Sequence, residues 1–339
     1  MYYRRYGRTN LQVSVVGLGS GGPSSLGQKT GVSESESQRV VRRALELGVN
    51  LIDTGEGYGD SEEILGRGLD GVPRASYVLC TKFNTFRPRN DPRRVEDPFR
   101  RTNRLGRSLP STRSLRRLRT DYVDVYQFHN VHPDEYPAIR DRFVPELRRQ
   151  QAPGKVRFIG VTERFSNDHT HAMLTAALAD DLWDSVMVGY NLLTPSPEGC
   201  VLPEAARRDV GVLVMCAVRR VIADPDKLAE LIRSLKAAGV LPPEAVADTD
   251  PLGWLVHDDV ESLTSAAYRF AAAHPAVSSV LTGTGSVRHL EQNVDAVLRG
   301  PLPVTDQQRL RALFGPIKRN LGEGTGYPDP DRSLVPDAR

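Results

Sequence analysis

Four side chains in the first half of the chain could together reduce a carbonyl group: Asp53, Tyr58, Lys82 and His129. A phenol such as that of Tyr58 is a weak acid, because its ordinary pKa is about 10. A neighbouring ammonium stabilises the phenolate and lowers that pKa, and Lys82 is placed in the sequence to do so. A buried ammonium needs a carboxylate, which Asp53 supplies. The imidazole of His129 can hydrogen-bond the carbonyl oxygen, so these residue types point to proton donation to a forming alkoxide.

The spacing of these residues places them at one edge of a sheet. Asp53 ends the apolar run 50–53, Lys82 follows the run 77–81, and His129 follows the run 122–128. Tyr58 lies in a glycine-rich loop between the first run and a helix that we expect to begin at Ser61. Because catalytic groups collect at the carboxyl ends of parallel strands, we expect the four side chains to meet there.

Each of the four side chains has a plainer explanation when it is taken singly. Asp53 and Lys82 could form a structural ion pair inside a barrel. Tyr58 could be a half-buried loop aromatic, and His129 could be a hydrogen-bonded histidine near a loop. Three successive strands that each deliver an ionisable group at the same end favour a site instead. A metal centre on Asp53 and His129 is disfavoured, because nothing in the sequence supplies a full ligand set.

Alternating strand and helix signals must position these residues. We expect strands at 15–19, 50–53, 77–81, 122–128, 155–161, 185–190, 211–216 and 278–281. We expect helices at 35–47, 61–69, up to 119, 136–150, 169–179, 203–208, 223–238, 260–273 and 287–298. The spacing of Ser35 and Gln38 predicts a capping box at the start of the first helix.

Eight strand-then-helix units predict an α/β fold, a parallel (β/α)8 TIM barrel. A hairpin within 2–13 precedes the barrel, and a C-terminal extension follows it. We expect a single barrel domain over 1–322. The polar residues 323–339 are rich in proline, which predicts a mobile tail.

The chain resembles the aldo-keto reductase family. The resemblance rests on the segments 48–54 and 58–62, Thr81-Lys82, the segments 114–118 and 121–124, His129, and the segment 154–161. It runs in order from about Tyr3 to Asn293. In this family the hairpin plugs the amino-terminal end of the barrel, which we expect here too. The resemblance implies an oxidoreductase that uses NAD(P)H to interconvert an aldehyde or ketone and an alcohol. It implies these roles: Tyr58 as proton donor, Lys82 as its tuner, Asp53 as the anchor of Lys82, and His129 as the group that orients the carbonyl.

The sequence has no Rossmann fingerprint, so the resemblance implies a nicotinamide dinucleotide lying across the barrel mouth. The expected cofactor-binding residues are Thr162, Asn191, Arg219, Arg220, Gly283, Thr284, Gly285, Arg288, Gln292 and Asn293. Backbone groups at a glycine-rich helix start suit phosphate, and Ser286 can cap the same helix. Arg219 and Arg220 could grip the pyrophosphate or form a solvated pair. Arg288 could pair with the extra phosphate of NADPH, so NADP(H) is favoured over NAD(H).

Several positions near the expected nicotinamide site depart from the family pattern. Thr162-Glu163 stand where Ser-Asn is usual, Met187 replaces a glutamine, and Cys216-Ala217 replace a stacking tyrosine. Thr162 keeps a hydroxyl for the carboxamide, whereas Glu163 is a poorer partner for the carboxamide oxygen. At the adenine end, Gly283 replaces a lysine and His289 an arginine, which weakens the preference for NADPH. We therefore expect an intact acid–base group beside an altered nicotinamide clamp.

Composition excludes several classes of protein. The 339 residues contain 45 basic and 42 acidic side chains, so a net charge of +3 gives no case for nucleic-acid binding. The sequence shows no signal-type core and no apolar run long enough to cross a membrane. Three widely spaced cysteines indicate a reducing, cytoplasmic location. Many arginines fall within 83–113, where we favour a solvated face over an anionic-substrate funnel.

Two rival functions stay open at this point. A cofactor-binding regulatory or subunit protein with little turnover is suggested by the altered clamp, and the intact acid–base group argues against it. A barrel isomerase or lyase without a cofactor predicts no nicotinamide binding. The expected partner is a small-molecule carbonyl compound, and neither its identity, the physiological direction nor the oligomeric state can be read from the sequence.

Overall fold

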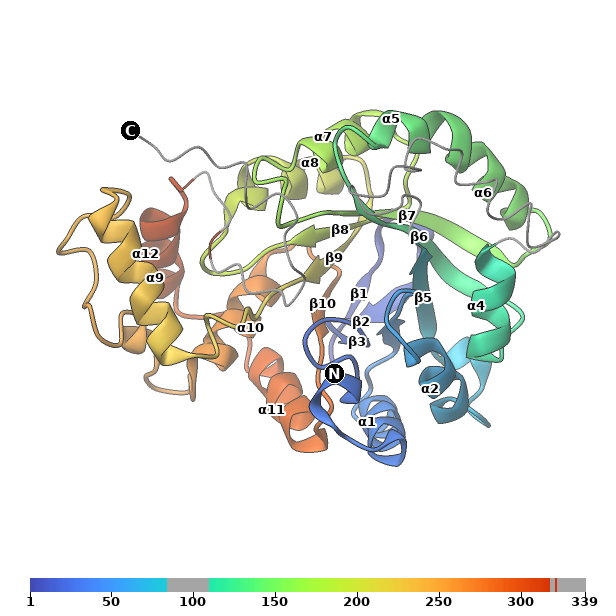
Figure 1. Ribbon diagram of the computed structural model, residues 1–339, viewed down its shortest axis with the longest axis horizontal. Helices are drawn as coiled ribbons and strands as arrows, with labels where there is room; N and C mark the ends of the chain where they lie inside the picture. Colours follow the sequence, from blue (N-terminus) through green and yellow to red (C-terminus); the bar gives the residue numbers. More distant parts are fainter. Residues whose placement is uncertain (84–109, 318–320, 322–339) are drawn as a thin grey trace.

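The computed structural model describes residues 1–83, 110–317 and 321. Eight parallel strands close into a barrel in the order β10-β3-β4-β5-β6-β7-β8-β9. Their bounds are β3 Val16–Gly19, β4 Leu51–Asp53, β5 Val78–Phe83, β6 Val123–Val131, β7 Val156–Glu163, β8 Ser185–Gly189, β9 Gly211–Met215 and β10 Ser279–Thr282. The predicted (β/α)8 TIM barrel is therefore confirmed (Figure 1).

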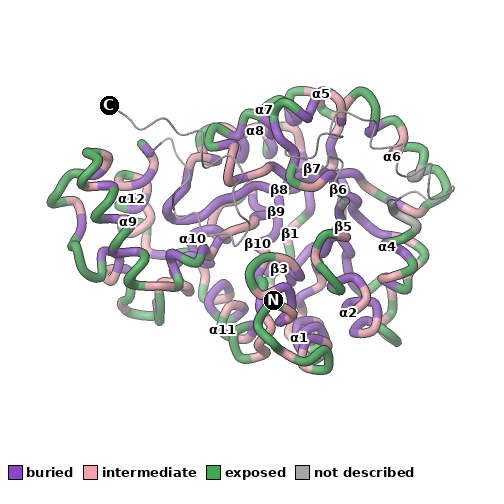
Figure 2. Tube along the Cα trace, in the orientation of Figure 1, coloured by how far each residue is buried: buried purple, intermediate pink, exposed green. Residues whose placement is uncertain are grey.

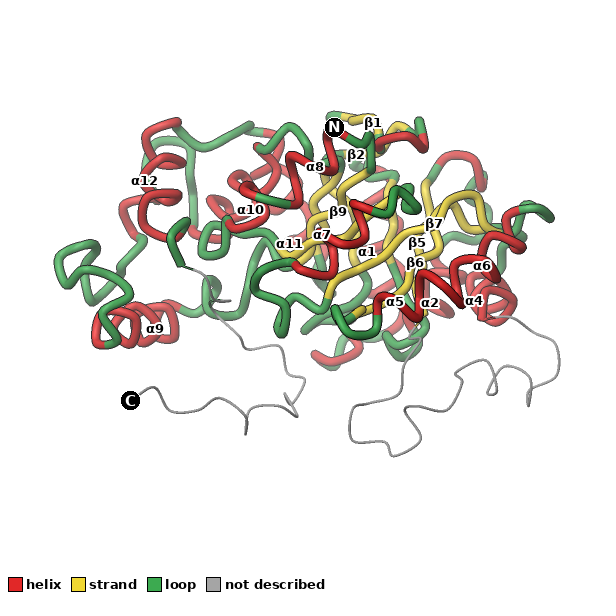
Figure 3. The backbone as a smooth tube through the Cα atoms, turned by 90° about the horizontal axis from the view of Figure 1, so that it is seen from above, coloured by secondary structure: helices red, strands yellow, loops and turns green. Residues whose placement is uncertain are grey.

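Helices surround the barrel strands, which run through the buried centre of the molecule (Figures 2 and 3). Their bounds are α1 Glu34–Glu46, α2 Ser61–Gly68, α4 Pro110–Leu118, α5 Tyr136–Ala138, α6 Val144–Gln151, α7 Ala172–Ala179, α8 Val201–Arg207, α9 Pro225–Ala237, α10 Leu263–Ala273, α11 Val287–Leu298 and α12 Val304–Phe314. Helices α9 and α12 lie on one side of the barrel, beyond α10 (Figure 1). Helix α9 belongs to the connection between β9 and β10, whereas α12 follows the barrel and forms the expected C-terminal extension. None of the described helices combines the length and the apolar character that crossing a membrane requires.

The hairpin of β1 (Tyr3–Arg5) and β2 (Gln12–Ser14) closes the amino-terminal end of the barrel, as expected. Between the two strands, the amide of Arg8 donates to the carbonyl of Asp209, just before β9. The buried hydroxyl of Tyr6 hydrogen-bonds Ser185 at the start of β8. Tyr6 packs with inward-facing residues of four strands, namely Leu51, Val78, Val125 and Leu213. This apolar layer forms the floor above which the polar side chains lie.

Several helix starts differ from the sequence prediction, among them those of α1, α7 and α10. Helix α1 is capped by Ser33, whose hydroxyl accepts from the amide of Glu36, and not by Ser35 as predicted. Ser33 and Glu36 have the same spacing as Ser35 and Gln38 but lie two positions earlier in the chain. The helix therefore begins before Ser35, which becomes part of its first turn. Gln38 instead donates to Glu34 within the helix, at 2.7 Å.

Helices α7 and α10 begin later than predicted. The carboxylate of Asp168 accepts from the amides of Ala172 and Met173, which fixes the first turn of α7 three residues beyond the predicted start. Ser262 accepts from the amide of Ser265 and so caps α10. The predicted helix 136–150 contains a π-helical turn at Ile139–Phe143, just before Pro145, which has no amide hydrogen for a regular helical bond.

Two predictions fall outside the described residues. Most of the arginine-rich stretch 83–113 lies in 84–109, and the tail 323–339 lies beyond residue 321. The single-domain assignment for 1–322 therefore stays a prediction.

Candidate active site

The alternation of side chains along each strand brings polar groups into the barrel mouth. On β5, Val78 and Cys80 point into the barrel core, and Lys82 is two residues further along the same face. On β4, Asp53 follows Leu51 in the same way. Strand β6 was predicted to end at Phe128, but it continues to Val131, so His129 lies within the strand and shares the face of Val125. Three neighbouring strands thus deliver ionisable groups above one apolar floor.

Asp53 and Lys82 form a buried ion pair. The ammonium Nζ lies 2.5 Å from Oδ2 of Asp53 and donates a second hydrogen bond of 2.6 Å to the carbonyl oxygen of Thr54. The other carboxylate oxygen, Oδ1, accepts from Nε2 of Gln127 at 3.2 Å. The side chain of Lys82 is fully buried and that of Asp53 is 4% exposed. Every contact named here holds the ammonium in one place beneath the mouth.

The electrostatics of this pair keep the lysine charged. Burial alone lowers the pKa of Lys82, but the carboxylate of Asp53 and the nearby phenol of Tyr58 outweigh it, so the pKa of Lys82 is raised. Burial raises the pKa of Asp53, against the opposing effects of Lys82 and Gln127. The result is an ammonium fixed in a site with little water, where its field acts strongly on neighbouring groups.

Tyr58 and His129 meet above this pair. The phenol oxygen of Tyr58 lies 3.2 Å from Nε2 of His129, and the two rings are in edge-to-face contact with centroids 5.4 Å apart. The ammonium of Lys82 lies 4.9 Å from the centroid of the Tyr58 ring. Both rings are only partly buried, so they form the part of the cluster that a substrate can reach. The structure thus brings together all four residues that the sequence singled out.

His129 is held neutral. Burial and the neighbouring Lys82 ammonium lower the pKa of His129 to about 3. A neutral imidazole has one donor and one acceptor nitrogen, so it can donate to a carbonyl oxygen without carrying a charge of its own.

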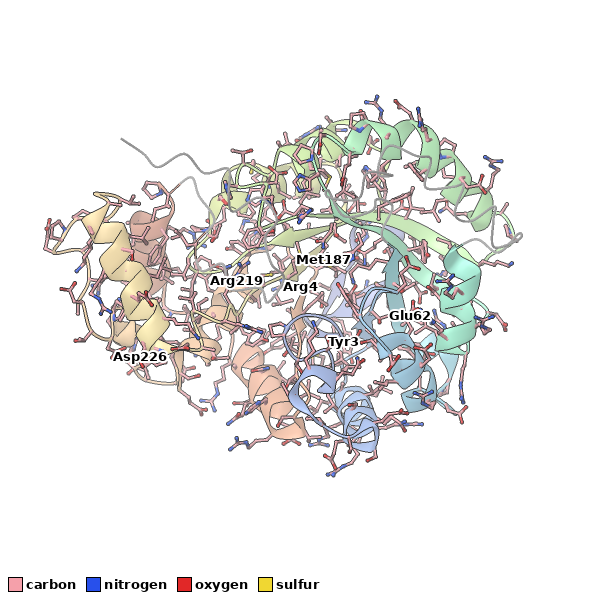
Figure 4. The ribbon with its side chains drawn as sticks, viewed as in Figure 1. Tyr3, Arg4, Glu62, Met187, Arg219 and Asp226 are labelled. Carbon is pink, nitrogen blue, oxygen red and sulfur yellow. The ribbon has the colours of Figure 1, made fainter. Side chains whose placement is uncertain are left out.

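Strand β5 is also tied to the helix outside it. Thr81 points away from the barrel interior, and its hydroxyl donates to the buried carboxylate of Glu62 on α2 at 2.8 Å. Arg117 of α4 lies 3.4 Å from the other oxygen of Glu62. Glu62 is labelled on the α2 side of the barrel in Figure 4. This contact fixes the strand that carries Lys82.

The residues expected to contact the nicotinamide differ from these four, because their polar atoms bond within the chain. The hydroxyl of Thr162 accepts from the amide of Asn130 at 2.8 Å. Asn191 donates from Nδ2 to the carbonyl of Cys216 and accepts at Oδ1 from the amide of Leu193. Both side chains are buried. Thr162 keeps a hydroxyl hydrogen to donate, whereas the bonds of Asn191 hold β8 and β9 together.

Glu163, which was expected to be a poorer partner for the carboxamide, is bonded within the chain. Both oxygens of its carboxylate have partners within the chain. Oε1 accepts from the amide of Gly189, and Oε2 lies 2.8 Å from Nδ1 of His171. The other imidazole nitrogen of His171 lies 2.8 Å from the hydroxyl of Ser196. Both Glu163 and His171 are fully buried, and burial raises the pKa of Glu163. This array joins the ends of β7 and β8 to the loops beyond them.

The segment after β9 places Arg219 and Arg220 differently from each other. Arg219 is 5% exposed, and its guanidinium lies 5.1 Å from the centroid of the Phe165 ring, while Arg220 is exposed. The alternative of a solvated pair is therefore wrong for Arg219, because its guanidinium is covered by the loop of Phe165. Met187, on β8, is buried in the apolar cluster inside the barrel, and its position is labelled in Figure 4.

The glycine-rich segment before α11 forms the other expected part of the cofactor site. Ser286 caps α11 by accepting from the amide of His289, and Thr284 accepts from the amide of Ser286. Gly283, Arg288 and Gln292 are exposed, whereas Asn293 bonds the hydroxyl of Thr282. The amino terminus of a helix of 12 residues, with an exposed arginine in its first turn, fits a phosphate-bearing ligand. Among the described residues, no group of acidic, histidine or cysteine side chains could hold a metal ion.

Sequence reasoning missed three residues that shape this site. Gln127 is two positions before His129 on the inward face, so strand alternation could have identified it. His171 lies in a left-handed backbone conformation, with φ of 55°, and carries no local signal of its bond to Glu163. Gln28 lies in a loop rich in glycine and serine and bonds the segment that carries Tyr58.

Comparison with known proteins agrees with this geometry. The model of the Aldo/keto reductase family matches residues 16–314. L-Galactose dehydrogenase of Arabidopsis thaliana is 30% identical over 328 residues, which cover 93% of this chain and 95% of the relative. The NADH-specific methylglyoxal reductase of Escherichia coli is 30% identical over 220 residues, covering 61% of this chain and 64% of the relative. The holo form of the aldo-keto reductase AKR11C1 from Bacillus halodurans superimposes with a TM-score of 0.67 at 25% identity, covering 93% of this chain and 96% of that one.

Proposed function

The chain belongs to the aldo/keto reductase family of NAD(P)H-dependent oxidoreductases, and on that premise we propose that it interconverts a carbonyl compound and an alcohol with Tyr58 as the proton donor. The observation that carries this proposal is the cluster of Asp53, Tyr58, Lys82 and His129. An ammonium held by a buried carboxylate lies beside a phenol, and the phenol meets a neutral imidazole at the barrel mouth.

Each side chain has a distinct role in the proposed reaction. The Tyr58 hydroxyl gives its proton to the oxygen of the carbonyl group as that oxygen gains negative charge. The Lys82 ammonium stabilises the phenolate that is left, and Asp53 keeps that ammonium charged and in place. The neutral His129 donates a hydrogen bond to the same oxygen and orients it toward Tyr58.

We propose that a nicotinamide dinucleotide lies across the mouth, with its adenine end and the extra phosphate of NADPH near Gly283, Thr284, Gly285 and Arg288. Its pyrophosphate would lie near Arg219 or Arg220. When bound, it supplies the hydride. Thr162 can still donate its hydroxyl hydrogen to a carboxamide, whereas the internal bonds of Asn191 and Glu163 argue for positioning roles. Gln292 is exposed on α11, where we propose that it contacts the adenine end, and Asn293 supports Thr282.

Arg288 supports a preference for NADP(H) over NAD(H), because it is exposed in the first turn of α11, where it can reach an added phosphate. The relative from E. coli is NADH-specific, so the two cofactors should be compared directly. Fluorescence titration with NADPH and NADH is expected to give tighter binding of NADPH. Equal affinities, or tighter NADH binding, would overturn this preference.

The proposed substrate class is a small aldehyde or ketone, or the alcohol it corresponds to. The relative named L-galactose dehydrogenase makes aldoses the first compounds to test. We also propose a cytoplasmic location, on the ground of the cysteine usage described above.

The proposed role of Tyr58 is tested by Tyr58→Phe. This change removes only the hydroxyl, so we expect turnover to fall by about 10²- to 10⁴-fold while cofactor binding is kept. Stopped-flow oxidation of bound NADPH with a panel of aldehydes measures turnover, and fluorescence measures binding. Full activity in the variant would remove Tyr58 from its role.

A second candidate function is that of a cofactor-binding protein with little turnover. The specific observation in its favour is that Asn191 and Glu163 bond within the chain. Single-turnover oxidation of NADPH in the wild-type protein separates the two candidates. Tight binding without oxidation by any carbonyl compound in a broad panel would favour this second function.

A further inference from the structure

The loop formed by residues 20–28 lies between the two parts of the proposed site. This loop is called here the strap. One side of the strap contacts the segment before α11. A Cβ atom placed on Gly285 would lie 2.5 Å from Cα of Gly27, and one placed on Gly283 would lie 3.6 Å from the carbonyl oxygen of Gly21. The strap therefore runs directly along the segment that we assign to the adenine end and the extra phosphate of NADPH.

The other side of the strap contacts Tyr58. A Cβ atom placed on Gly21 would lie 2.6 Å from Cε2 and Cζ of the Tyr58 ring, so the backbone at Gly21 covers that ring closely. The buried hydroxyl of Ser61 donates to the carbonyl of Ser20 at 2.9 Å. The ring and the following turn are thus both packed against the strap.

The side chain of Gln28 joins the strap to the turn 58–61 by hydrogen bonds. Its amide nitrogen Nε2 lies 2.8 Å from the hydroxyl of Ser61 and 3.3 Å from the carbonyl oxygen of Tyr58, and it also bonds the carbonyl of Ser25 at 2.8 Å. Its oxygen Oε1 accepts from the amide of Asp60 at 2.9 Å. One amide group therefore fixes the backbone of the turn 58–61 at both a donor and an acceptor.

The turn itself is shaped around this amide. Gly59 has φ of +62°, and a Cβ atom there would lie 2.8 Å from Oε1 of Gln28. A residue with a side chain at this position would be strained and would press on Gln28. The close approach shows that the turn and the amide are matched to each other.

We propose that Gln28 is a positioning residue for the reaction, holding the turn 58–61 so that the Tyr58 hydroxyl stays against His129 and above Lys82. Because Gln28 belongs to the strap, dinucleotide binding along 283–285 steadies Tyr58 as well. This inference rests on the proposed function, in which Tyr58 donates the proton. A displacement of about 1 Å at such a group is enough to lower the rate about a hundredfold.

The test compares Gln28→Met with a control just beyond the strap, in the 3-10 turn Gln28–Thr30. Methionine keeps the length of the side chain and removes all four hydrogen bonds. The control is Thr30→Ala, since the Thr30 hydroxyl donates to Gly27 and lies outside the contact with the turn 58–61. Steady-state kinetics, NADPH titration by fluorescence, and the pH profile of kcat are measured for both variants and the wild type.

We expect Gln28→Met to lower kcat for carbonyl reduction about ten- to a hundredfold, with the Kd for NADPH within about threefold of wild type. The alkaline limb of its kcat profile should move to higher pH, because a phenol further from an ammonium is a weaker acid. Thr30→Ala should match the wild type in all three measurements. A structural role alone would lower binding and kcat together and leave the limb in place.

Gln28→Glu gives a second measurement that does not depend on how well methionine packs. The carboxylate keeps the acceptor for Asp60 but cannot donate to Ser61 or Tyr58, so kcat should fall near neutral pH. As the pH is lowered and this carboxyl group gains a proton, donation returns and kcat should recover toward the wild-type value. A kcat within twofold of wild type in both variants would overturn the proposal.

The outcome for Tyr58→Phe separates this inference from the proposed function. An inactive Tyr58→Phe variant beside fully active Gln28 variants overturns only the positioning role of Gln28. A fully active Tyr58→Phe variant overturns the proton donor, and the role of Gln28 with it.

Discussion

The two halves of the barrel mouth use polar side chains in opposite ways. In the acid–base half, built on β4, β5 and β6, Asp53 and Lys82 form a pair that faces Tyr58 and the open mouth. In the nicotinamide half, built on β7, β8 and β9, Glu163 and Asn191 bond to backbone groups and to His171. Both halves carry buried polar groups at strand ends. The comparison shows that a residue type at such a position does not say whether it serves a ligand or holds the barrel together.

The two halves differ in whether their buried charged groups can still act on a neighbour after their bonds within the chain are made. The ammonium of Lys82 keeps a field that acts on Tyr58 after its bonds to Asp53 and Thr54 are made. The carboxylate of Glu163 has each oxygen bonded inside the chain, and its side chain is fully buried, so it presents no exposed oxygen to a ligand. The acid–base half therefore keeps a charge that can act on a neighbouring group, whereas the named polar groups of the nicotinamide half are held by bonds within the chain.

The largest expected effect comes from Lys82→Met in the acid–base half. It leaves the buried carboxylate of Asp53 without its ammonium, so we expect unfolding free energy to fall by about 3–5 kcal/mol. Turnover should fall by about 10³-fold or more, because the phenolate of Tyr58 loses its stabilising charge. Thermal unfolding and stopped-flow oxidation of NADPH measure the two effects.

The double variant Asp53→Leu/Lys82→Met is the matched control for that experiment. Replacing both partners of a buried ion pair by apolar side chains is often neutral for stability. We expect the double variant to recover most of the lost stability while its turnover stays low. Recovery of turnover along with stability would show that Lys82 acts on the fold and not on Tyr58.

Much of the acid–base half could be predicted from the sequence, because its members are local to successive strands. Period-two alternation and the order of the strands are enough to place Asp53, Lys82 and His129 at one edge. The strands themselves run further than predicted, to Phe83 and Val131, because polar residues such as Lys82 and His129 interrupt the apolar run while the backbone pairing continues.

The nicotinamide half could not be predicted in the same way. Glu163 was expected to face the carboxamide as a poor partner, but its partners are Gly189 and His171. The contact with Gly189 crosses from β7 to β8, and that with His171 depends on a left-handed backbone residue. No residue pattern along the chain encodes either contact, and the same is true of Gln28 beside the turn 58–61.

Glu163→Asn gives the next largest effect and tests the nicotinamide half. Asparagine restores the residue type usual in the family, but it is too short to reach both Gly189 and His171. We expect unfolding free energy to fall by about 1–3 kcal/mol, because buried partners lose their acceptor. The Kd for NADPH should stay within about threefold of wild type, since Glu163 bonds the chain and not the ligand.

Glu163→Gln is the control for length in that experiment. Its oxygen can still accept from the amide of Gly189, so it should be less destabilising than Glu163→Asn. Chemical denaturation and fluorescence titration compare the two variants. A clear tightening of NADPH binding in Glu163→Asn, with unchanged stability, would mean that this position faces the cofactor after all and that the two halves are alike.

The smallest expected effect is the absence of an acidic limb in the pH profile. The pKa of His129 is lowered to about 3, so its ring gains a proton only when the pH falls toward that value. Between about pH 5 and pH 8 the ring is therefore neutral throughout, and kcat/KM for carbonyl reduction should show no limb from an imidazole in that range. The measurement is a set of steady-state assays across the range, repeated with His129→Gln. A limb with a midpoint near pH 6 in the wild type that disappears in His129→Gln would show that the ring carries a proton in the working enzyme. In that case water reaches His129 and weakens the field of Lys82. The acid–base half would then lose the strong field of its ammonium, which is what distinguishes it from the nicotinamide half.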